Sequence, residues 1–458
     1  MICSVLFIPI CKTYQIERGG ANMGNTKQGK STREIVFEFY AKHASSCDCS
    51  YETAEDKDIY KLYSDVKNMW EKNTLFAKTS IIILTANKYE RNILHQKVYG
   101  TSRNKIQRIE IELFTACQRF KKAFAYWFEW NGYSVLNIHA NVTGSYTIGG
   151  SADIVRWVFS NKYLFPMAII SFGICFGTMQ NNSELGDVVI SRKVYPYFIG
   201  AKINGERISV VDDNAFIITD NLDNRIRDLE NSNRLNGFEF KVKFKNYITG
   251  EAVVSSGIFR DKFVDITTQE IYAGDMEGYG LFKECSSYPY SVPCLIVKSI
   301  CDWADEKNFN TNDEEIISEF KAIFYRENSK TTINEINILD TLKDRLQAYS
   351  ASCAFEVLGV FMDSRAIRRA IFDDIKDWIT NFNGKATTCK KVHSIAVDSI
   401  KKSNLGFSVS ESFIHRCLII LEESGIIKCD PACRCAQYKE DKCSVSELRA
   451  SIDVIKEG

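Results

Sequence analysis

The segment from Cys294 to Asp305 runs from apolar residues into two acids. Cys-Leu-Ile-Val-Lys-Ser-Ile-Cys leads directly into Asp302, followed by Trp303 and, two positions later, the second acid. α/β enzymes commonly place working carboxylates at the carboxyl end of a buried strand. Beside Ile300 and Trp303 a carboxyl would be partly desolvated, which favours its protonated form and suits a general acid. The alternative is that Asp302 only caps the segment that follows.

A second pair of acids, Asp275 and Glu277, flanks Met276 about one strand earlier. Asp275 is expected to cap the following helix and Glu277 to lie in its first turn, where the helix dipole favours a carboxylate. Acids at a helix start commonly have only this role, so capping is the alternative to ligand binding here.

Two further segments follow apolar runs. Glu90 comes shortly after the run Ser80 to Thr85 and is expected at the start of a helix. Gly173 and Gly177 end another apolar run, and glycines at such a place let a ligand approach backbone N–H groups closely. Each feature is unspecific when taken by itself.

Together, in this order, the four segments resemble the nucleoside phosphorylase and methylthioadenosine (S-adenosylhomocysteine) nucleosidase superfamily. The resemblance rests mainly on Gly-Asp-Met-Glu277, on Lys-Ser-Ile-Cys-Asp302-Trp-Ala-Asp305 and on Leu-Gly-Asp187-Val-Val. It implies an enzyme that cleaves the N-glycosidic bond of a purine nucleoside or nucleotide.

The resemblance also implies roles for single residues. Asp302 matches the acid that protonates or hydrogen-bonds N7 of the leaving purine, which is a poor leaving group until then. Met276 and Glu277 match the ribose-binding position, with Glu277 accepting the 2′- and 3′-hydroxyls. Glu90 matches the glutamate that orients and deprotonates water in nucleosidases. A carboxylate near the sugar also suits the oxocarbenium-like transition state of glycosidic cleavage.

Other positions line the implied pocket. Lys298 falls where nucleosidases have an arginine near that water, and the Gly173 loop matches the segment around the water or phosphate. Asp275 is counted with the substrate-binding residues. The loop departs from the family pattern, because Phe176 stands where nucleosidases tend to have glycine and Ile174 where they have serine.

The nucleophile decides between hydrolysis and phosphorolysis. A phosphorylase needs cationic side chains for phosphate, yet Ser171 stands where purine phosphorylases of this family have an arginine, and Glu90 would repel phosphate. We therefore expect a purine nucleosidase, adenine being the expected base, that needs no cofactor. Arg91, Lys88 and Lys298 keep a phosphate-dependent purine nucleoside phosphorylase open as an alternative, and a non-catalytic nucleotide sensor is a further one.

The elements that must position these residues alternate along the chain. Strands are expected at Ser80 to Thr85, Ser134 to Ala140, Met167 to Phe172, Asp187 to Ser191, Gly237 to Val242, Ala252 to Ser255 and Cys294 to Ile300. Helices are expected from Lys88, and at Lys105 to Phe128, Ala152 to Phe159, Met276 to Cys285 and Asp313 to Arg326. This alternation predicts an α/β fold in which helices sandwich a phosphorylase-type mixed sheet over residues 78–330.

Two flanking regions differ from this pattern. Residues 1–77 are expected to form a helical segment, in which Ile59, Leu62, Val66 and Trp70 have helical spacing. Residues 335–458 are expected to form a small helical, winged-helix-like domain, whose last helix ends at Gly425 and turns into a strand. Its cysteines (Cys429, Cys433, Cys435 and Cys443) lack the paired spacing of a zinc site, so no metal is expected.

Bulk composition limits the remaining possibilities. The 58 basic and 58 acidic side chains cancel, so neither a nucleic-acid partner nor a membrane anchor is expected. The 16 cysteines are scattered, which suits a reducing, cytoplasmic location. Cys175, Cys294 and Cys301 are expected to be buried.

The resemblance implies a homo-oligomer. A nucleosidase domain with flanking regions is similar to effectors of antiviral defence.

Overall fold

A computed structural model describes the chain from residue 59 to 304 and from 336 to 363. It also describes residues 373–377 and, singly, 381, 418 and 421. Gaps inside the first range fall at 103, 115–119, 165, 179–182, 198–201, 205–206, 210–214, 252–259, 262–269 and 288–291. Of the predicted winged-helix-like domain (335–458) only the residues from 336 onward in these ranges are described, and its predicted strand after Gly425 and the C-terminal cysteine group lie outside the described residues. The same holds for the strand at Ala252, the helix at Asp313 and Asp305.

One eleven-stranded mixed sheet organises the described chain, in the order β1-β3-β4-β5-β2-β6-β12-β11-β7-β10, with β13 pairing with both β6 and β7. Its strands are β1 (Tyr63–Val66), β2 (Ile81–Thr85), β3 (Ile106–Phe114), β4 (Phe120–Trp130), β5 (Tyr133–His139), β6 (Ala168–Gly177), β7 (Val188–Pro196), β10 (Phe216–Ile217), β11 (Val242–Thr249), β12 (Ile271–Asp275) and β13 (Cys294–Asp302). A separate hairpin joins β8 (Lys202–Asn204) to β9 (Arg207–Ser209). The predicted α/β fold with a mixed sheet is confirmed.

Part of the sheet closes on itself. β6 pairs with β12, β12 with β11, β11 with β7, β7 with β13, and β13 with β6 again, which makes a five-stranded ring. All residues of β2 and β12 are buried, as expected for strands covered on both sides. The carboxyl ends of β2, β6, β12 and β13 carry the predicted site residues.

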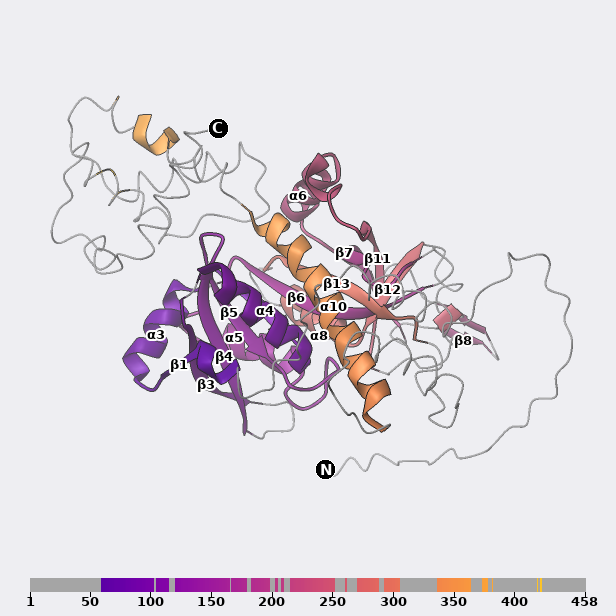
Figure 1. The fold of residues 1–458 in the computed structure, drawn as a ribbon, viewed down its shortest axis with the longest axis horizontal. Coiled ribbons are helices and arrows are strands. Elements are labelled where there is room, and N and C mark those ends of the chain that lie inside the picture. Colours follow the sequence, from indigo (N-terminus) through magenta and orange to yellow (C-terminus); the bar gives the residue numbers. More distant parts are fainter. Residues whose placement is uncertain are drawn as a thin grey trace, which may run out of the picture.

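Helices cover both faces of the sheet. They are α3 (Met69–Lys78), α4 (Lys88–Ser102), α5 (Ser151–Ser160), α6 (Asp220–Glu230), α8 (Gly278–Ser287) and α10 (Ile336–Met362), with short 3-10 turns at Tyr60–Leu62 and Asn233–Leu235. In Figure 1, α4 and α10 lie side by side in front of the sheet, while α5 and α8 pack together behind it. Among the described residues, no helix is both long enough and apolar enough to cross a membrane.

The predicted helix from Lys105 to Phe128 is wrong, because this segment forms the antiparallel strands β3 and β4. Along β3 the side chains of Ile109, Ile111 and Leu113 are buried, while the residues between them face outward. This period of two belongs to a strand with one covered face, whereas a helix would repeat near 3.6 residues.

Two other expectations are also wrong. The helix through Ile59 to Trp70 is replaced by a 3-10 turn and strand β1, which pairs in parallel with β3. Trp70 lies in the first turn of α3 and is 76% exposed instead of packing with Val66. The strand expected from Gly237 starts only at Val242, since the residues before it form turns.

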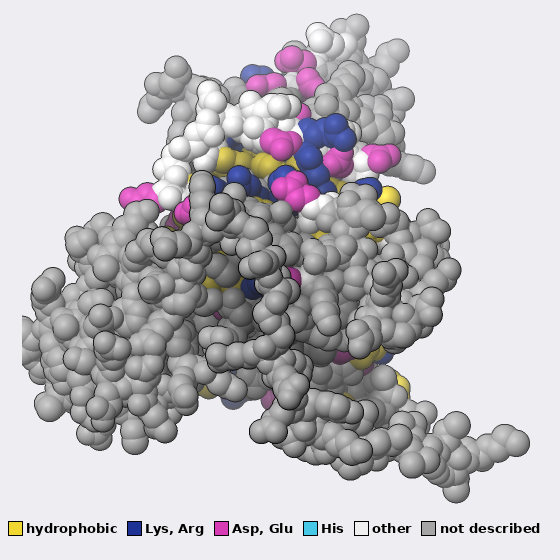
Figure 2. Space-filling model, turned by 90° about the vertical axis from the view of Figure 1, so that its right-hand side faces the viewer, with side chains coloured by type: hydrophobic (Ala, Val, Ile, Leu, Met, Phe, Trp, Pro, Cys, Tyr) yellow, Lys and Arg dark blue, Asp and Glu magenta, His cyan; other side chains and the backbone are white. Residues whose placement is uncertain are grey.

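Charges of both signs are interspersed on the surface. On the face shown in Figure 2, the described Lys and Arg side chains lie close to Asp and Glu side chains. Arg192 makes ion pairs with Asp223 and Glu230, and Lys245 pairs with Glu270. On the described part of this face, no large patch of one sign is seen.

Candidate active site

Glu90 is fixed at the start of α4 by backbone N–H groups from two elements. Its Oε2 accepts hydrogen bonds from the backbone N–H of Ala86 (2.6 Å) and of Asn87 (3.1 Å). Asn87 Oδ1 in turn accepts from the backbone N–H of Glu90 (3.0 Å), which completes a reciprocal cap of the helix. Oε1 accepts from the backbone N–H of Ile174 on β6 (3.0 Å). A carboxylate accepts about four hydrogen bonds, so among the described residues one position on Oε1 stays open to a further donor.

The buried position of Glu90 changes its acidity. The residue is 1% exposed, and burial raises the pKa of its carboxyl to about 7. The Lys298 ammonium lowers this pKa, while the Glu277 carboxylate raises it further. A carboxyl of this acidity exchanges protons near neutral pH, as a general base requires.

Gly173 is the residue that allows this contact. Its φ is +146°, and a Cβ built there would lie 2.0 Å from Oε1 of Glu90. Any side chain at this position would therefore displace Glu90. The sequence analysis predicted a close backbone approach to a ligand at Gly173, and the structure shows a close approach to the Glu90 carboxylate.

Lys298 lies on β13 between two carboxylates. Its Nζ is 2.7 Å from Glu277 Oε2 and 2.7 Å from Asp275 Oδ2, and the side chain is 1% exposed. Burial alone would lower the pKa of Lys298, but Asp275, Glu277 and Glu90 together raise it well above its ordinary value. The lysine is therefore charged and forms a buried ionic cluster with Asp275 and Glu277, and the Glu90 carboxyl is near enough for its charge to act on the lysine.

Asp275 and Glu277 are held by the end of β12 and the start of α8. Asp275 Oδ1 accepts from Thr249 Oγ1 (2.8 Å) and from the backbone N–H of Gly278 (3.0 Å), so it caps α8 as predicted. Glu277 immediately precedes α8 instead of lying in its first turn. Its Oε1 accepts from the backbone N–H of Gly144 (3.3 Å).

A loop between β5 and α5 completes this side of the site, and the sequence analysis missed it. Ser145 Oγ donates to the carbonyl of the half-buried Met276 (2.8 Å), and Ser151 Oγ donates to the carbonyl of Glu277 (2.6 Å). Gly144 has a φ of +107°. The glycines and serines from Gly144 to Ser151 follow an apolar strand, the same signal that singled out Gly173.

Asp302 is brought to the same edge by strand pairing. It is opposite Phe176 of β6, and Phe176 is in turn opposite Gly274, the residue before Asp275. Burial raises the pKa of the neighbouring Cys175 thiol, Lys298 lowers it, and Asp275 and Asp302 raise it further. Cys175 thus lies among these groups. Asp302 Oδ1 accepts from the backbone N–H of Ala304 (2.8 Å), so the capping alternative is also realised.

The segment after Asp302 is anchored by residues that the sequence analysis did not single out. Trp303 is 1% exposed, and its indole N–H donates to the carbonyl of Ser183 (3.3 Å). The buried Arg260 guanidinium donates to the carbonyl of Trp303. These contacts hold the chain on both sides of the indole and so orient the Asp302 carboxyl.

The assembled groups can support acid–base chemistry on a bound molecule. Asp275, Glu277 and Lys298 form one buried cluster, and Glu90 lies against Gly173 beside it. Met276 follows β12 and Asp302 ends β13, the two strands that pair with β6 near Phe176. Among the described residues, no group of three or more His, Cys, Asp or Glu side chains has the arrangement of a metal site. The predicted burial of Cys175, Cys294 and Cys301 is confirmed.

Comparison with solved structures finds nucleosidases and a related hydrolase. The 5′-methylthioadenosine/S-adenosylhomocysteine nucleosidase of Neisseria meningitidis, in complex with methylthio-immucillin-A, is 15% identical with a TM-score of 0.42. It is covered over 99% of its length and matches 63% of this chain. The futalosine hydrolase of Helicobacter pylori is 13% identical with a TM-score of 0.43, covering 98% of that protein and 63% of this chain.

Sequence comparison gives a firmer result. None of the curated proteins compared with the chain matches it. The family model described as the phosphorylase superfamily matches residues 82–332, more than half of the 458 residues, and spans every candidate site residue. The chain therefore belongs to the phosphorylase superfamily.

Proposed function

We propose that this chain is a purine nucleosidase, which hydrolyses the N-glycosidic bond of a nucleoside or nucleotide to free base and sugar. The observation that carries the proposal is the state of Glu90. It is buried, its pKa is raised to about 7, and one acceptor position of its carboxylate has no donor among the described residues beside Gly173 of β6. Such a group can orient a water molecule and take its proton.

The remaining groups have complementary roles in this proposal. Glu277 accepts the sugar hydroxyls, and the Met276 side chain packs on the sugar. The Glu277 carboxylate, held 2.7 Å from Lys298 Nζ, also stabilises the oxocarbenium-like sugar. Asp302 donates a proton or hydrogen bond to N7 of the departing purine. Together these roles supply a base, a charge stabiliser and an acid around one bond.

Charge supports hydrolysis over phosphorolysis. The Glu90 carboxylate accepts from the backbone N–H of Ile174, in the segment that was expected to be a loop and is part of strand β6, where a phosphate would have to bind. Ser171, which stands in the place of a family arginine, is buried and carries no charge to attract the phosphate. Placing a dianion beside an ionised Glu90 would be costly in so buried a site.

The test is chromatography of a mixture of purine nucleosides and nucleotides after incubation with the protein, with and without inorganic phosphate. Base release without phosphate is expected, adenine compounds being the preferred substrates. Glu277→Gln and Asp302→Asn are each expected to abolish it, whereas Glu110→Gln, on the surface of β3, leaves it unchanged. Base release only in the presence of phosphate, or full activity in either site variant, would overturn the proposal.

Two wider expectations belong to the same proposal. The chain is expected to form a homo-oligomer, which light scattering of the full chain measures. A role as an antiviral-defence effector predicts that cells producing the wild type resist phage infection and that cells producing Asp302→Asn do not. Equal plaque counts for both would remove that role without affecting the nucleosidase assignment.

A further inference from the structure

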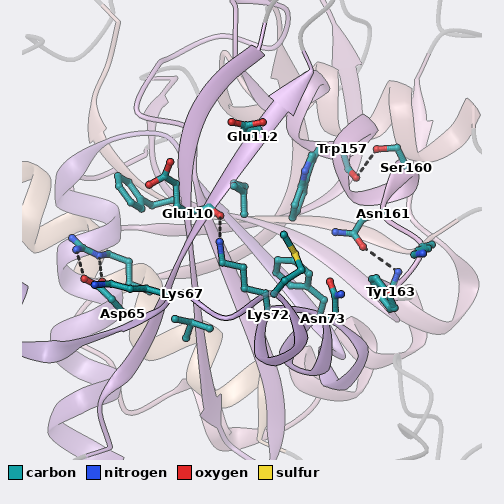
Figure 3. A pocket seen from close by; sticks show the side chains of 17 residues that line it. Asp65, Lys67, Lys72, Asn73, Glu110, Glu112, Trp157, Ser160, Asn161 and Tyr163 are labelled. Atoms are coloured by element: carbon teal, nitrogen blue, oxygen red, sulfur yellow. Dashed lines mark hydrogen bonds and ion pairs between the residues drawn. The ribbon is translucent and has the colours of Figure 1, made fainter.

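A second cavity lies away from the ionic cluster. It has a volume of about 970 Å³ and lies between α3, strands β1 and β3, and the C-terminal end of α5 (Figure 3). None of the candidate active-site residues lines it. Its volume is at the upper end of the roughly 300–1,000 Å³ typical of small-molecule sites.

One wall of this cavity is apolar and aromatic. The indole of Trp157 is partly buried and packs edge-on against the buried ring of Phe76, with centroids 5.7 Å apart. Val66 and Ile111 extend the apolar surface, and Tyr163 lies beside Asn161 (Figure 3). A half-buried indole with apolar neighbours favours a planar ring as its partner.

The charged side chains that line the cavity are four cations and three acids, a net excess of one positive charge (Lys67, Lys72, Arg108 and Lys162; Asp65, Glu110 and Glu112). Lys72 Nζ donates to the backbone carbonyl of Glu110 (3.2 Å), and Lys162 Nζ lies 5.1 Å from the centroid of the Tyr163 ring. Arg108 is paired with Asp65 at 2.7 Å, and Glu110 is paired with Lys122 at 2.7 Å outside the cavity. Among the described residues, no ion pair is formed by the three lining lysines, Lys67, Lys72 and Lys162. Of the three lining acids, Glu112 alone forms no ion pair with another described residue. The cavity therefore favours an anionic ligand.

The cavity also has side-chain amides that can hydrogen-bond to the edge of a bound heterocyclic ring. Asn73 of α3 and Asn161 after α5 both line the cavity. Asn161 Oδ1 accepts from the backbone N–H of Tyr163 (3.0 Å), which orients the amide and leaves its NH2 group for another partner. Side-chain amides can donate to and accept from the edge of a heterocycle.

We propose that this cavity is a second ligand site, which binds a nucleotide. The base would stack on Trp157 and meet the asparagine amides, and the phosphate would lie among the lysines. This site is separate from the proposed nucleosidase site. Helix α5 reaches both: Ser151 at its start contacts Glu277, and Trp157 lies about 9 Å further along the helix axis. A nucleotide bound here is out of reach of the acids that would cleave it.

The test is equilibrium dialysis of the full chain against formycin 5′-monophosphate, whose carbon–carbon glycosidic bond a nucleosidase does not cleave. All measurements use protein that carries Glu277→Gln. This substitution is expected to weaken binding of the ligand at the candidate active site, so the binding that remains reports on the second cavity. There, Lys72→Glu and Lys162→Glu are each expected to raise the Kd about tenfold or more, since each removes a charge-assisted contact to phosphate. Lys283→Glu, an exposed change on α8, is the matched control and leaves the Kd unchanged.

Two results would overturn the inference. One is the absence of bound ligand in the Glu277→Gln background, and the other is a Kd that neither lysine substitution changes. Both lysines are at the surface or half-buried, and circular dichroism verifies that the variants fold. The nucleosidase proposal and the second-site proposal can fail independently. Base release tests the first and does not use the lysine variants. Dialysis tests the second with a ligand that is not cleaved.

Discussion

At the residue scale, the chemistry depends on how Lys298 and Glu277 act on Glu90. The raised pKa of Glu90 comes first from burial, and Lys298 opposes it. Since the base must be ionised to take a proton from water, kcat/KM of the wild type is expected to fall as the pH drops through about 7.

Replacing Lys298 provides a test of this dependence. Lys298→Gln removes the charge that lowers the pKa of Glu90, so the acidic limb of the kcat/KM profile is expected to move to higher pH. Lys298→Arg keeps the charge and should keep the limb near its original position. Because the change to Gln leaves buried carboxylates without a cation, circular dichroism must first show that the variant folds. A limb at the same pH in a folded Lys298→Gln protein would contradict the assignment of Glu90 as the base.

Gly173 gives a second residue-scale prediction. Gly173→Ala would place a methyl group 2.0 Å from Oε1 of Glu90, at a φ of +146° that L residues rarely adopt. Base release is expected to fall by about tenfold or more, because the base would be displaced from its water. Gly237→Ala is the control, since a Cβ there meets no atom within 4 Å. Equal activity of the two variants would show that Glu90 does not need this geometry.

The placement of Glu90, Glu277 and Asp302 just after apolar strands could be predicted from sequence, because buried strands appear as short apolar runs. Their roles in the site stay predictions. The contacts of Gly144, Ser145 and Arg260 could not be predicted in this way, because each joins residues far apart in the sequence and one partner in each is a backbone group. Such contacts depend on how β5 and α5 lie against α8, and no local spacing encodes that arrangement.

At the scale of elements, α4 combines a structural role with a chemical one. Asn87 and Glu90 cap the helix reciprocally, and Glu90 is also the proposed base. Asn87→Ala is expected to cost about 1 kcal/mol of stability and to lower base release, because Glu90 loses the partner that fixes its backbone.

A matched variant separates these two effects. Asn68 caps α3 by accepting from the backbone N–H of Trp70 (2.9 Å), far from the ionic cluster. Asn68→Ala is expected to lose a similar free energy of unfolding in denaturant titrations and to keep full base release. If both variants lose activity equally, the cap of α4 has no specific role in the site.

The same scale explains the wrong helix prediction. Residues 105 to 128 contain many Lys, Arg, Glu and Gln residues, which have good helix propensity. Their Ile, Phe and Trp side chains nevertheless alternate with polar ones, and tertiary pairing with β1 and β5 outweighs local propensity. The short buried strands β2 and β13 were predicted correctly because their apolar runs have no competing helical pattern.

At the scale of the whole molecule, the folded unit extends beyond the region that the family match covers. The match ends at residue 332, yet α10, which begins at Ile336, packs on α4, β6 and β13. Ser350 Oγ donates to the carbonyl of Ile300 (3.0 Å), two residues before Asp302. Phe355 stacks on Trp130 with ring centroids 4.8 Å apart. This helix therefore covers the sheet and supports the strand that carries the proposed acid.

Two positions on α10 test that conclusion. Leu358 is fully buried, so Leu358→Ala is expected to cost about 2–5 kcal/mol through lost burial and the cavity left behind. Glu356, two residues earlier, is 46% exposed and pairs with Lys97 at the surface, so Glu356→Ala is expected to cost no more than about 1 kcal/mol. Denaturant titration of the full chain, followed by tryptophan fluorescence, measures both. If the two substitutions cost the same, α10 is an appendage to the sheet and the folded unit ends where the family match does.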